Sequence, residues 1–277
     1  MSESLVCAAC GAQFPPREKP PENCPICLDE RQFVPGTGQS WLTLEQIKKK
    51  HANQFRQHEP GLLGIAMVPQ FCIGQRACLI KTPEGNFLWD CITLLDDATI
   101  EIVKGLGGIA GIAVSHPHYY TTMADWSRAF GNVPIYIHAD DRQWVTCPND
   151  SIQFWEDDTK RVATGLTLIR CGGHFAGGTV AHWKEGGKGK GALLTGDIIM
   201  VIPDRSHVSF MRSFPNLIPL SGPSVERLGR ILAPYDYDVI YGAFMDRNIL
   251  KGGKQALQRS VTRYVKAVSG DGSGELH

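Results

Sequence analysis

The chain has 277 residues, of which 43% are hydrophobic and 20% are charged. This composition predicts one large packed domain plus a small module and excludes a disordered chain. The 28 basic residues equal the 28 acidic residues, so no overall charge attracts nucleic acid. No apolar run approaches the roughly 20 residues that cross a bilayer, and the N-terminus lacks the features of a secretory signal. We therefore expect a cytoplasmic protein with no nucleic-acid partner and no membrane partner.

Near the N-terminus lie two Cys-x-x-Cys pairs, Cys7 with Cys10 and Cys24 with Cys27, separated by 13 residues. Each pair turns two thiolates toward one point, and two pairs complete a tetrahedral four-sulfur site of the kind found in reducing compartments. The proline-rich segment between them cannot form a core, so metal binding must supply its folding free energy. The pattern resembles a zinc ribbon and predicts structural zinc, with a rubredoxin-like iron site or a catalytic dithiol as alternatives. Because all four positions are ligands, the module is structural or a docking surface for a protein partner.

The remaining elements follow from periodicity and turn residues. A linker is expected at 35–40, and the polar stretch 41–58 predicts a short helix with solvated His51 and His58. Helices are further expected at 97–104, 124–130, 224–232 and 254–268, and strands at 64–68, 76–82, 87–92, 108–114, 133–138, 167–170, 191–194 and 239–241. A turn at 83–86 predicts a hairpin. The expected divisions are a ribbon at 1–38, a main domain at 39–268 and a disordered tail at 269–277.

Four ligand-type side chains follow predicted strands. His116 and His118 end an apolar run at i and i+2, so both rings project to the same side and offer two imidazoles to one metal ion. Alone, this pair is a weak signal, because two surface histidines on a loop would look the same. His174 stands between glycines that let the backbone turn sharply, and Asp197 ends another buried strand.

The order of these motifs resembles that of the metallo-β-lactamase fold superfamily. The matching motifs are His116-x-His118, Gly173-His174-x-x-Gly177-Gly178-Thr179 and Leu194-Thr195-Gly196-Asp197. The resemblance covers roughly residues 60–265. It implies an α+β fold, a four-layer αββα sandwich preceded by the four-cysteine ribbon, with a metal site where strand ends meet.

Three departures concern the second metal position of that superfamily. Tyr120 and Thr121 stand where its first motif has Asp and His, and Ala243 stands where its last His ligand is usual. What the resemblance implies is therefore a single site of His116, His118, His174 and Asp197. That site takes one zinc, iron or manganese ion, or stays empty.

The resemblance also suggests roles around that site. Asp197 is a candidate base or fourth ligand, and Tyr120, or Tyr119 beside it, is a candidate hydrogen-bond donor to the water or an oxyanion. Asp90 matches an aspartate that supports a metal-bound histidine, and a buried carboxylate that stabilises its own turn explains it equally well. His207 and Asp246 are candidates for the pocket wall, although plain surface positions explain both more simply.

Two functions compete at this point, and a third is minor. The first is a mononuclear metal hydrolase whose metal-activated water attacks a small ester, thioester or lactone. The second is a catalytically degenerate binding or scaffold protein that recruits a protein partner through its ribbon. The third is oxygen or redox chemistry at a single iron.

Overall fold

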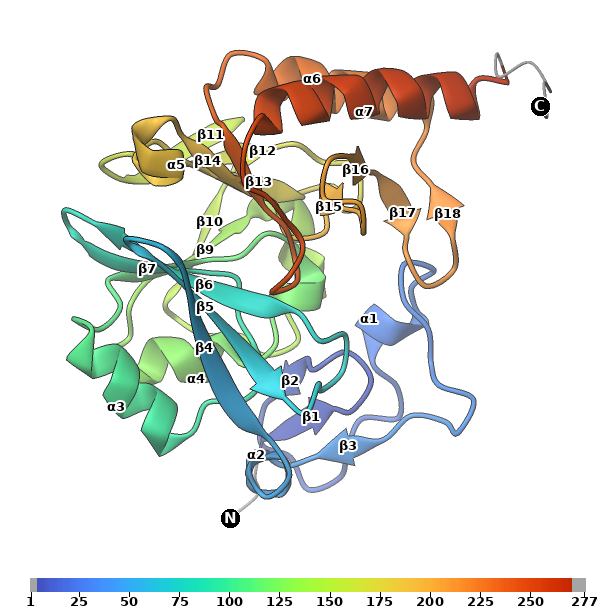
Figure 1. Ribbon diagram of the computed structural model, residues 1–277. Helices are drawn as coiled ribbons and strands as arrows, with labels where there is room; N and C mark the ends of the chain where they lie inside the picture. The colour runs from blue at the N-terminus through green and yellow to red at the C-terminus, as the bar shows by residue number, and fades with distance from the viewer. Residues whose placement is uncertain (1–3, 271–277) are drawn as a thin grey trace.

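Two β-sheets face one another, and helices cover the outer face of each sheet, in the computed structural model of residues 4–270 (Figure 1). The first sheet has the order β10-β9-β8-β7-β6-β5-β4 and the second β11-β12-β13-β14-β19-β20. This is the αββα sandwich that the resemblance implies. In the first sheet the strands are β4 (Ala52–Glu59), β5 (Leu62–Val68), β6 (Arg76–Thr82), β7 (Gly85–Trp89), β8 (Gly111–Ala113), β9 (Ile135–His138) and β10 (Ile152–Trp155). In the second they are β11 (Thr159–Ala163), β12 (Leu166–Arg170), β13 (Thr179–Trp183), β14 (Ala192–Leu194), β19 (Val239–Tyr241) and β20 (Asn248–Ile249).

Parallel pairing brings the ends of separate strands to one edge. Strands β7, β8, β9 and β10 are parallel, as are β14 and β19 in the other sheet. Side chains that follow the carboxyl ends of parallel strands meet at the same edge of a sheet. Asp90 follows β7, His116 follows β8, and Asp197 follows β14, so the topology itself gathers the candidate site. The β6–β7 hairpin predicted at 83–86 is confirmed.

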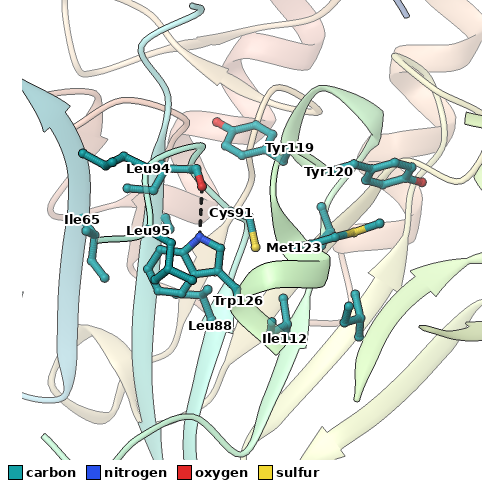
Figure 2. Packing of buried hydrophobic residues seen from close by; sticks show 14 of the residues in the cluster. Ile65, Leu88, Cys91, Leu94, Leu95, Ile112, Tyr119, Tyr120, Met123 and Trp126 are labelled. Carbon is teal, nitrogen blue, oxygen red and sulfur yellow. Dashed lines mark hydrogen bonds between the residues drawn. The ribbon is translucent and has the colours of Figure 1, made fainter. Parts of the chain in front are cut away.

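Apolar side chains fill the space between the layers. Between the two sheets, Ile80, Phe87 and Trp89 meet Leu168 and Trp183. The outer face of the first sheet packs against α3 (Asp97–Gly105) and α4 (Met123–Ala129). Figure 2 shows Trp126 of α4 in the middle of that cluster, and its indole N–H donates to the Ile92 carbonyl over 3.0 Å.

The helices α6 (Gly222–Leu232) and α7 (Gly253–Val268) cover the second sheet (Figure 1). Val225 and Leu228 of α6 and Leu257 of α7 are buried in the cluster that they form with it. Shorter elements connect the layers: the 3-10 helices η1 (Pro117–Tyr119) and η2 (Ala139–Trp144), the helix α5 (Gly186–Gly189), and the two-stranded pairs β15 (Met200–Val201) with β16 (Val208–Ser209) and β17 (Met211–Ser213) with β18 (Ile218–Pro219). Over residues 4–270, none of the helices has the length and apolar character that crossing a membrane requires.

The cysteine module packs directly on the sandwich. Its small sheet has the order β2-β1-β3, from β1 (Leu5–Cys7), β2 (Gln13–Phe14) and β3 (Trp41–Leu42), and its helices are α1 (Pro25–Leu28) and α2 (Leu44–Lys48). Val6 of β1 and Ile47 of α2 are buried in the same cluster as Trp126. The ribbon sheet thus takes its third strand from beyond residue 38. The division into domains stays a prediction, and most of the predicted tail at 269–277 lies outside the described residues.

The helix predicted over 41–58 is wrong in extent. The helix α2 ends at Lys48, and the chain then forms the strand β4, which pairs antiparallel with β5. At the start of α2, Thr43 and Gln46 form a reciprocal capping box. Because β4 is an edge strand with largely exposed side chains, it shows none of the apolar alternation by which a strand is recognised. The polar composition of this segment therefore led to the prediction of a helix.

His58 on β4 is not a solvated histidine, and this has a consequence for stability. Its Nε2 accepts a hydrogen bond from the buried Arg76 over 2.8 Å. Burial first, and then the charges of Arg76 and Arg56, lower the pKa of His58 from 6.5 to about 4. The unfolded chain therefore binds more protons than the folded one between those pH values, so the free energy of unfolding falls as pH falls through them.

We expect His58→Gln to remove part of that pH dependence. Urea unfolding at pH 7 and at pH 4.5 should show a smaller loss of stability in the variant than in wild type. The control is His51→Gln, which changes a histidine whose ring contacts the carbonyl of Pro69 at the surface. Equal slopes in His58→Gln and wild type would contradict this account of His58.

Candidate metal centre

The four N-terminal cysteines converge on one point. The Cys7 and Cys27 sulfurs lie 3.6 Å apart and the Cys10 and Cys24 sulfurs 3.7 Å apart. A tetrahedron of thiolates at the usual zinc–sulfur bond length places its sulfurs about 3.8 Å apart, so the four side chains fit such an ion. The neighbouring thiols of Cys24, Cys27 and Cys7, and then burial, raise the pKa of Cys10 well above its usual value. A bound cation would favour the thiolate form of all four cysteines.

The second cluster is built from three separate connections of the sandwich. His116 and His118 leave β8 through η1, His174 lies in the loop between β12 and β13, and Asp197 follows β14. One ligand atom from each of the four lies within 4.8 Å of the others. None of the four residues is more than 5% exposed. The structure thus brings together all four of the ligands expected at this site.

Hydrogen bonds decide which nitrogen of His174 faces the cluster. Its Nδ1 lies 3.1 Å from the carbonyl oxygen of Met211, and a carbonyl only accepts, so this nitrogen carries the proton. The Nε2 lone pair is then free and lies 3.4 Å from Nδ1 of His118. Burial, followed by the neighbouring His116 and His174, lowers the pKa of His118 well below its usual value. Neutral imidazoles are the form that binds a metal.

The fit to a metal ion rests on spacing and on unpaired atoms. Nitrogens bound tetrahedrally to zinc at the usual bond length lie about 3.3 Å apart, close to the 3.4 Å between His118 and His174. The His116 Nε2 and Asp197 Oδ2 atoms are 3.6 Å apart. His116 Nε2 and Asp197 Oδ1 are buried without a hydrogen-bond partner. Such buried polar atoms are costly, and a bound cation would satisfy this cluster.

Asp90 supports His116 through Ser115. The Ser115 N–H donates to Asp90 Oδ1 over 2.7 Å, and the Ser115 hydroxyl lies 2.9 Å from His116 Nδ1. This leaves His116 Nε2 for the cluster. Burial raises the pKa of Asp90 to about 8, against the opposing effect of the Ser115 hydrogen bonds. Gly196 lets the strand end approach, because a Cβ there would lie 2.5 Å from the Ser115 hydroxyl oxygen.

The three residues that depart from the superfamily's second set of ligands lie inside the protein. Tyr120, Thr121 and Ala243 are all buried, and none of the three is a ligand of the usual kind. Tyr119 lies against them, because its hydroxyl donates to the Ala243 carbonyl over 3.3 Å. Within residues 4–270, the only groups of three or more potential ligands are the two already described. Of these two groups, the one in the sandwich is the cluster of three histidines and Asp197.

The two tyrosines point in opposite directions (Figure 2). The Tyr119 ring centroid lies 5.2 Å from that of His116, whereas the Tyr120 hydroxyl donates to the backbone oxygen of Asp141 over 3.4 Å. Tyr119 is thus the tyrosine that the structure places beside the histidines. The Tyr120 hydroxyl points away from the cluster, so this geometry does not support the catalytic role predicted for Tyr120.

We expect Tyr120→Phe to leave the metal content of the histidine cluster unchanged. The variant loses one long hydrogen bond, so its free energy of unfolding should drop by about 1 kcal/mol. Metal analysis and thermal unfolding of Tyr120→Phe beside Tyr119→Phe would measure both effects. Loss of the metal in Tyr120→Phe alone would restore Tyr120 to the site.

His207 and Asp246 lie outside the cluster. His207 Nδ1 pairs with Asp204 at 2.7 Å on a loop, and the Asp246 side chain is 78% exposed and pairs with Arg56. Asp246 does line a surface groove of 710 Å³, together with Gly74, Met200 and Phe244 among others. None of the four candidate ligands lines this groove, so the place of Asp246 in a substrate pocket stays a prediction, as does that of His207.

Three residues that contact the cluster were not predicted from the sequence. The Phe175 ring centroid lies 5.1 Å from those of His118 and His174. The Gln75 amide donates to the His118 carbonyl over 3.1 Å, and Arg31 of the ribbon donates to the His174 carbonyl over 2.7 Å. Only Phe175 stands next to a motif residue, so adjacency could have suggested it.

Comparison with known proteins gives one relative and many similar folds. The uncharacterized protein YmaE of Bacillus subtilis (strain 168) is 46% identical over 268 residues, which are 96% of this chain and 97% of YmaE. The chain belongs to the YmaE family. No protein-family model matches it.

Solved structures similar to this YmaE-family chain share its fold at low identity. The DIM-1 metallo-β-lactamase has a TM-score of 0.56 at 10% identity, covering 75% of this chain and 97% of its own. VMB-1 has 0.58 at 9%, covering 78% and 97%. A Cronobacter sakazakii metallo-β-lactamase with a HARLDQ motif has 0.52 at 17%, covering 79% and 93%. The predicted metallo-β-lactamase sandwich is therefore confirmed, as a fold.

Proposed function

We propose that the protein is a metal-dependent hydrolase with one metal ion, zinc or else iron or manganese, held by His116, His118 and His174, with Asp197 beside it and a fourth position open to water. The observation that carries the proposal is the burial of these four converging side chains, with His116 Nε2 and Asp197 Oδ1 left unpaired. A cluster of this kind destabilises the fold unless a cation binds it. A zinc ion there would lower the pKa of a water molecule from 15.7 to about 7 and supply hydroxide at neutral pH.

The chain's own residues divide the remaining work. Asp197 lies beside His116 and is the carboxylate that would hold the attacking water or accept its proton. Asp90 and Ser115 keep His116 in its orientation. The groove beside Gly74, Met200 and Phe244 adjoins the loops that carry Gln75 and Ala243, and it would receive a small ester, thioester or lactone.

A scaffold protein without turnover is the second candidate. It is supported by the absence of the superfamily's second set of ligands from their usual sequence positions and by two exposed apolar side chains of the ribbon region, Leu28 at 61% and Phe33 at 51% exposed. These would dock a protein partner. The same site would then hold its metal for stability alone.

A panel of chromogenic esters, thioesters and lactones separates the two candidates. Protein loaded with zinc, manganese or iron should hydrolyse at least one class, and Asp197→Asn should lose that activity while keeping its fold. Silence across the panel with the histidine cluster fully metal-loaded would favour the scaffold. The matched control is Asp204→Asn, which changes a surface carboxylate outside the site.

A further inference from the structure

The ribbon reaches the histidine cluster through one side chain, Arg31. Its Nε donates to the backbone oxygen of His174 over 2.7 Å. Its guanidinium carbon lies 4.4 Å from the centroid of the Phe175 ring. Arg31 therefore holds both the backbone of a predicted ligand and the aromatic ring packed beneath the cluster.

Arg31 is itself fixed by the cysteine module. Asp29 Oδ1 accepts hydrogen bonds from the Arg31 backbone N–H over 2.9 Å and from its Nη1 over 2.7 Å. The side chains of this pair are only 13% and 19% exposed. Cys24 caps α1 and Cys27 lies within it, so the position of Asp29 and Arg31 depends on how these two cysteines are held.

The ribbon also contacts the other loops around the cluster. The Gln13 backbone N–H donates to the Thr121 carbonyl over 3.1 Å, near the end of the segment that carries His118. Glu30 pairs with Arg212, next to Met211, whose carbonyl orients His174. Figure 1 shows α1 facing the β17–β18 hairpin, which contains Met211 and Arg212.

From these contacts we propose that the two metal centres are coupled and that Arg31 is the positioning residue between them. Metal in the cysteine cluster fixes α1, Arg31 then holds the His174 loop in place, and the histidine cluster binds its metal more tightly. By thermodynamic linkage, metal at the histidine cluster raises the metal affinity of the cysteine cluster by the same factor. The coupling rests on the metal site of the proposed function.

Metal competition tests the coupling. Wild type, Arg31→Met and Arg31→Gln would be titrated with a chromogenic zinc chelator. Cobalt-substituted samples would report the cysteine site separately, through its thiolate absorption. Supporting groups outside the ligand set typically change metal affinity 10- to 100-fold. We expect a loss of that size at the histidine site, with the cysteine site still occupied. The matched control is Arg17→Met, at an exposed arginine of the same module, which should keep wild-type affinity.

The outcomes separate the coupling from the function. Wild-type affinity at the histidine site, in either Arg31 variant that keeps its ribbon metal, would overturn the coupling alone. A wild-type chain that binds metal only at the cysteines would overturn the proposed hydrolase and the coupling together. Loss of histidine-site affinity in Arg17→Met as well would also overturn the role of Arg31, because it would show a general effect of ribbon charge.

Discussion

Replacing Cys24 and Cys27 together by serine will remove one metal ion per chain and unfold the ribbon. The module's own buried cluster consists largely of its four cysteines with Phe14 and Ile26, so little else stabilises it. Structural zinc contributes an apparent binding free energy of about 10–16 kcal/mol in zinc-finger peptides, far more than such a small core supplies. Because Val6 and Ile47 pack into the main cluster, the sandwich should lose stability too.

Metal analysis and limited proteolysis check this expectation. The double variant should be cleaved within residues 4–43 under conditions that leave wild type intact. Cys147→Ser is the control, since Cys147 is a half-buried cysteine outside both clusters. A double variant that resists protease and keeps the metal content of wild type would show that the cysteine cluster is not a structural metal site.

Replacing His116 and His118 together by alanine will abolish hydrolysis. The change removes two of the four converging ligands, and with them the means of lowering the pKa of water. Since the pKa shift from 15.7 to about 7 governs the supply of hydroxide, we expect a fall in kcat/KM of at least about 10³-fold. His207→Ala, at a histidine paired with Asp204 away from the cluster, should keep wild-type activity.

Assays on the substrate class identified by the chromogenic panel measure this effect. Far-ultraviolet circular dichroism would establish that the double variant retains the sandwich. Full activity in the folded variant would mean that hydrolysis takes place elsewhere on the protein.

The parts of the site that could be predicted are those tied to strand ends and glycines. His116, His118 and Asp197 follow apolar strands that have a parallel neighbour. His174 stands beside glycine in the connection between the antiparallel strands β12 and β13. The four cysteines were recognisable from spacing alone. In both cases the local sequence pattern directly reflects the geometry that the site requires.

The parts that could not be predicted depend on long-range packing. Which of Tyr119 and Tyr120 faces the histidines is decided by the turn of η1 after Pro117, and adjacent residues look alike in sequence. Arg31 lies in a polar stretch without periodicity, and only the docking of the ribbon brings it within 2.7 Å of the His174 carbonyl. The edge strand β4 lacks the alternation of apolar and polar residues that identifies a strand in a sequence.

Elemental analysis of the protein purified without added metal tests the central claim most directly. Wild type and the His116→Ala/His118→Ala double variant would be compared, with protein concentration from amino-acid analysis. Two ions per chain in wild type and one in the variant are expected, because residues 4–270 hold one cysteine cluster and one histidine cluster. One ion per chain in both proteins, unchanged after dialysis against zinc, manganese or iron, would contradict a metal centre in the sandwich.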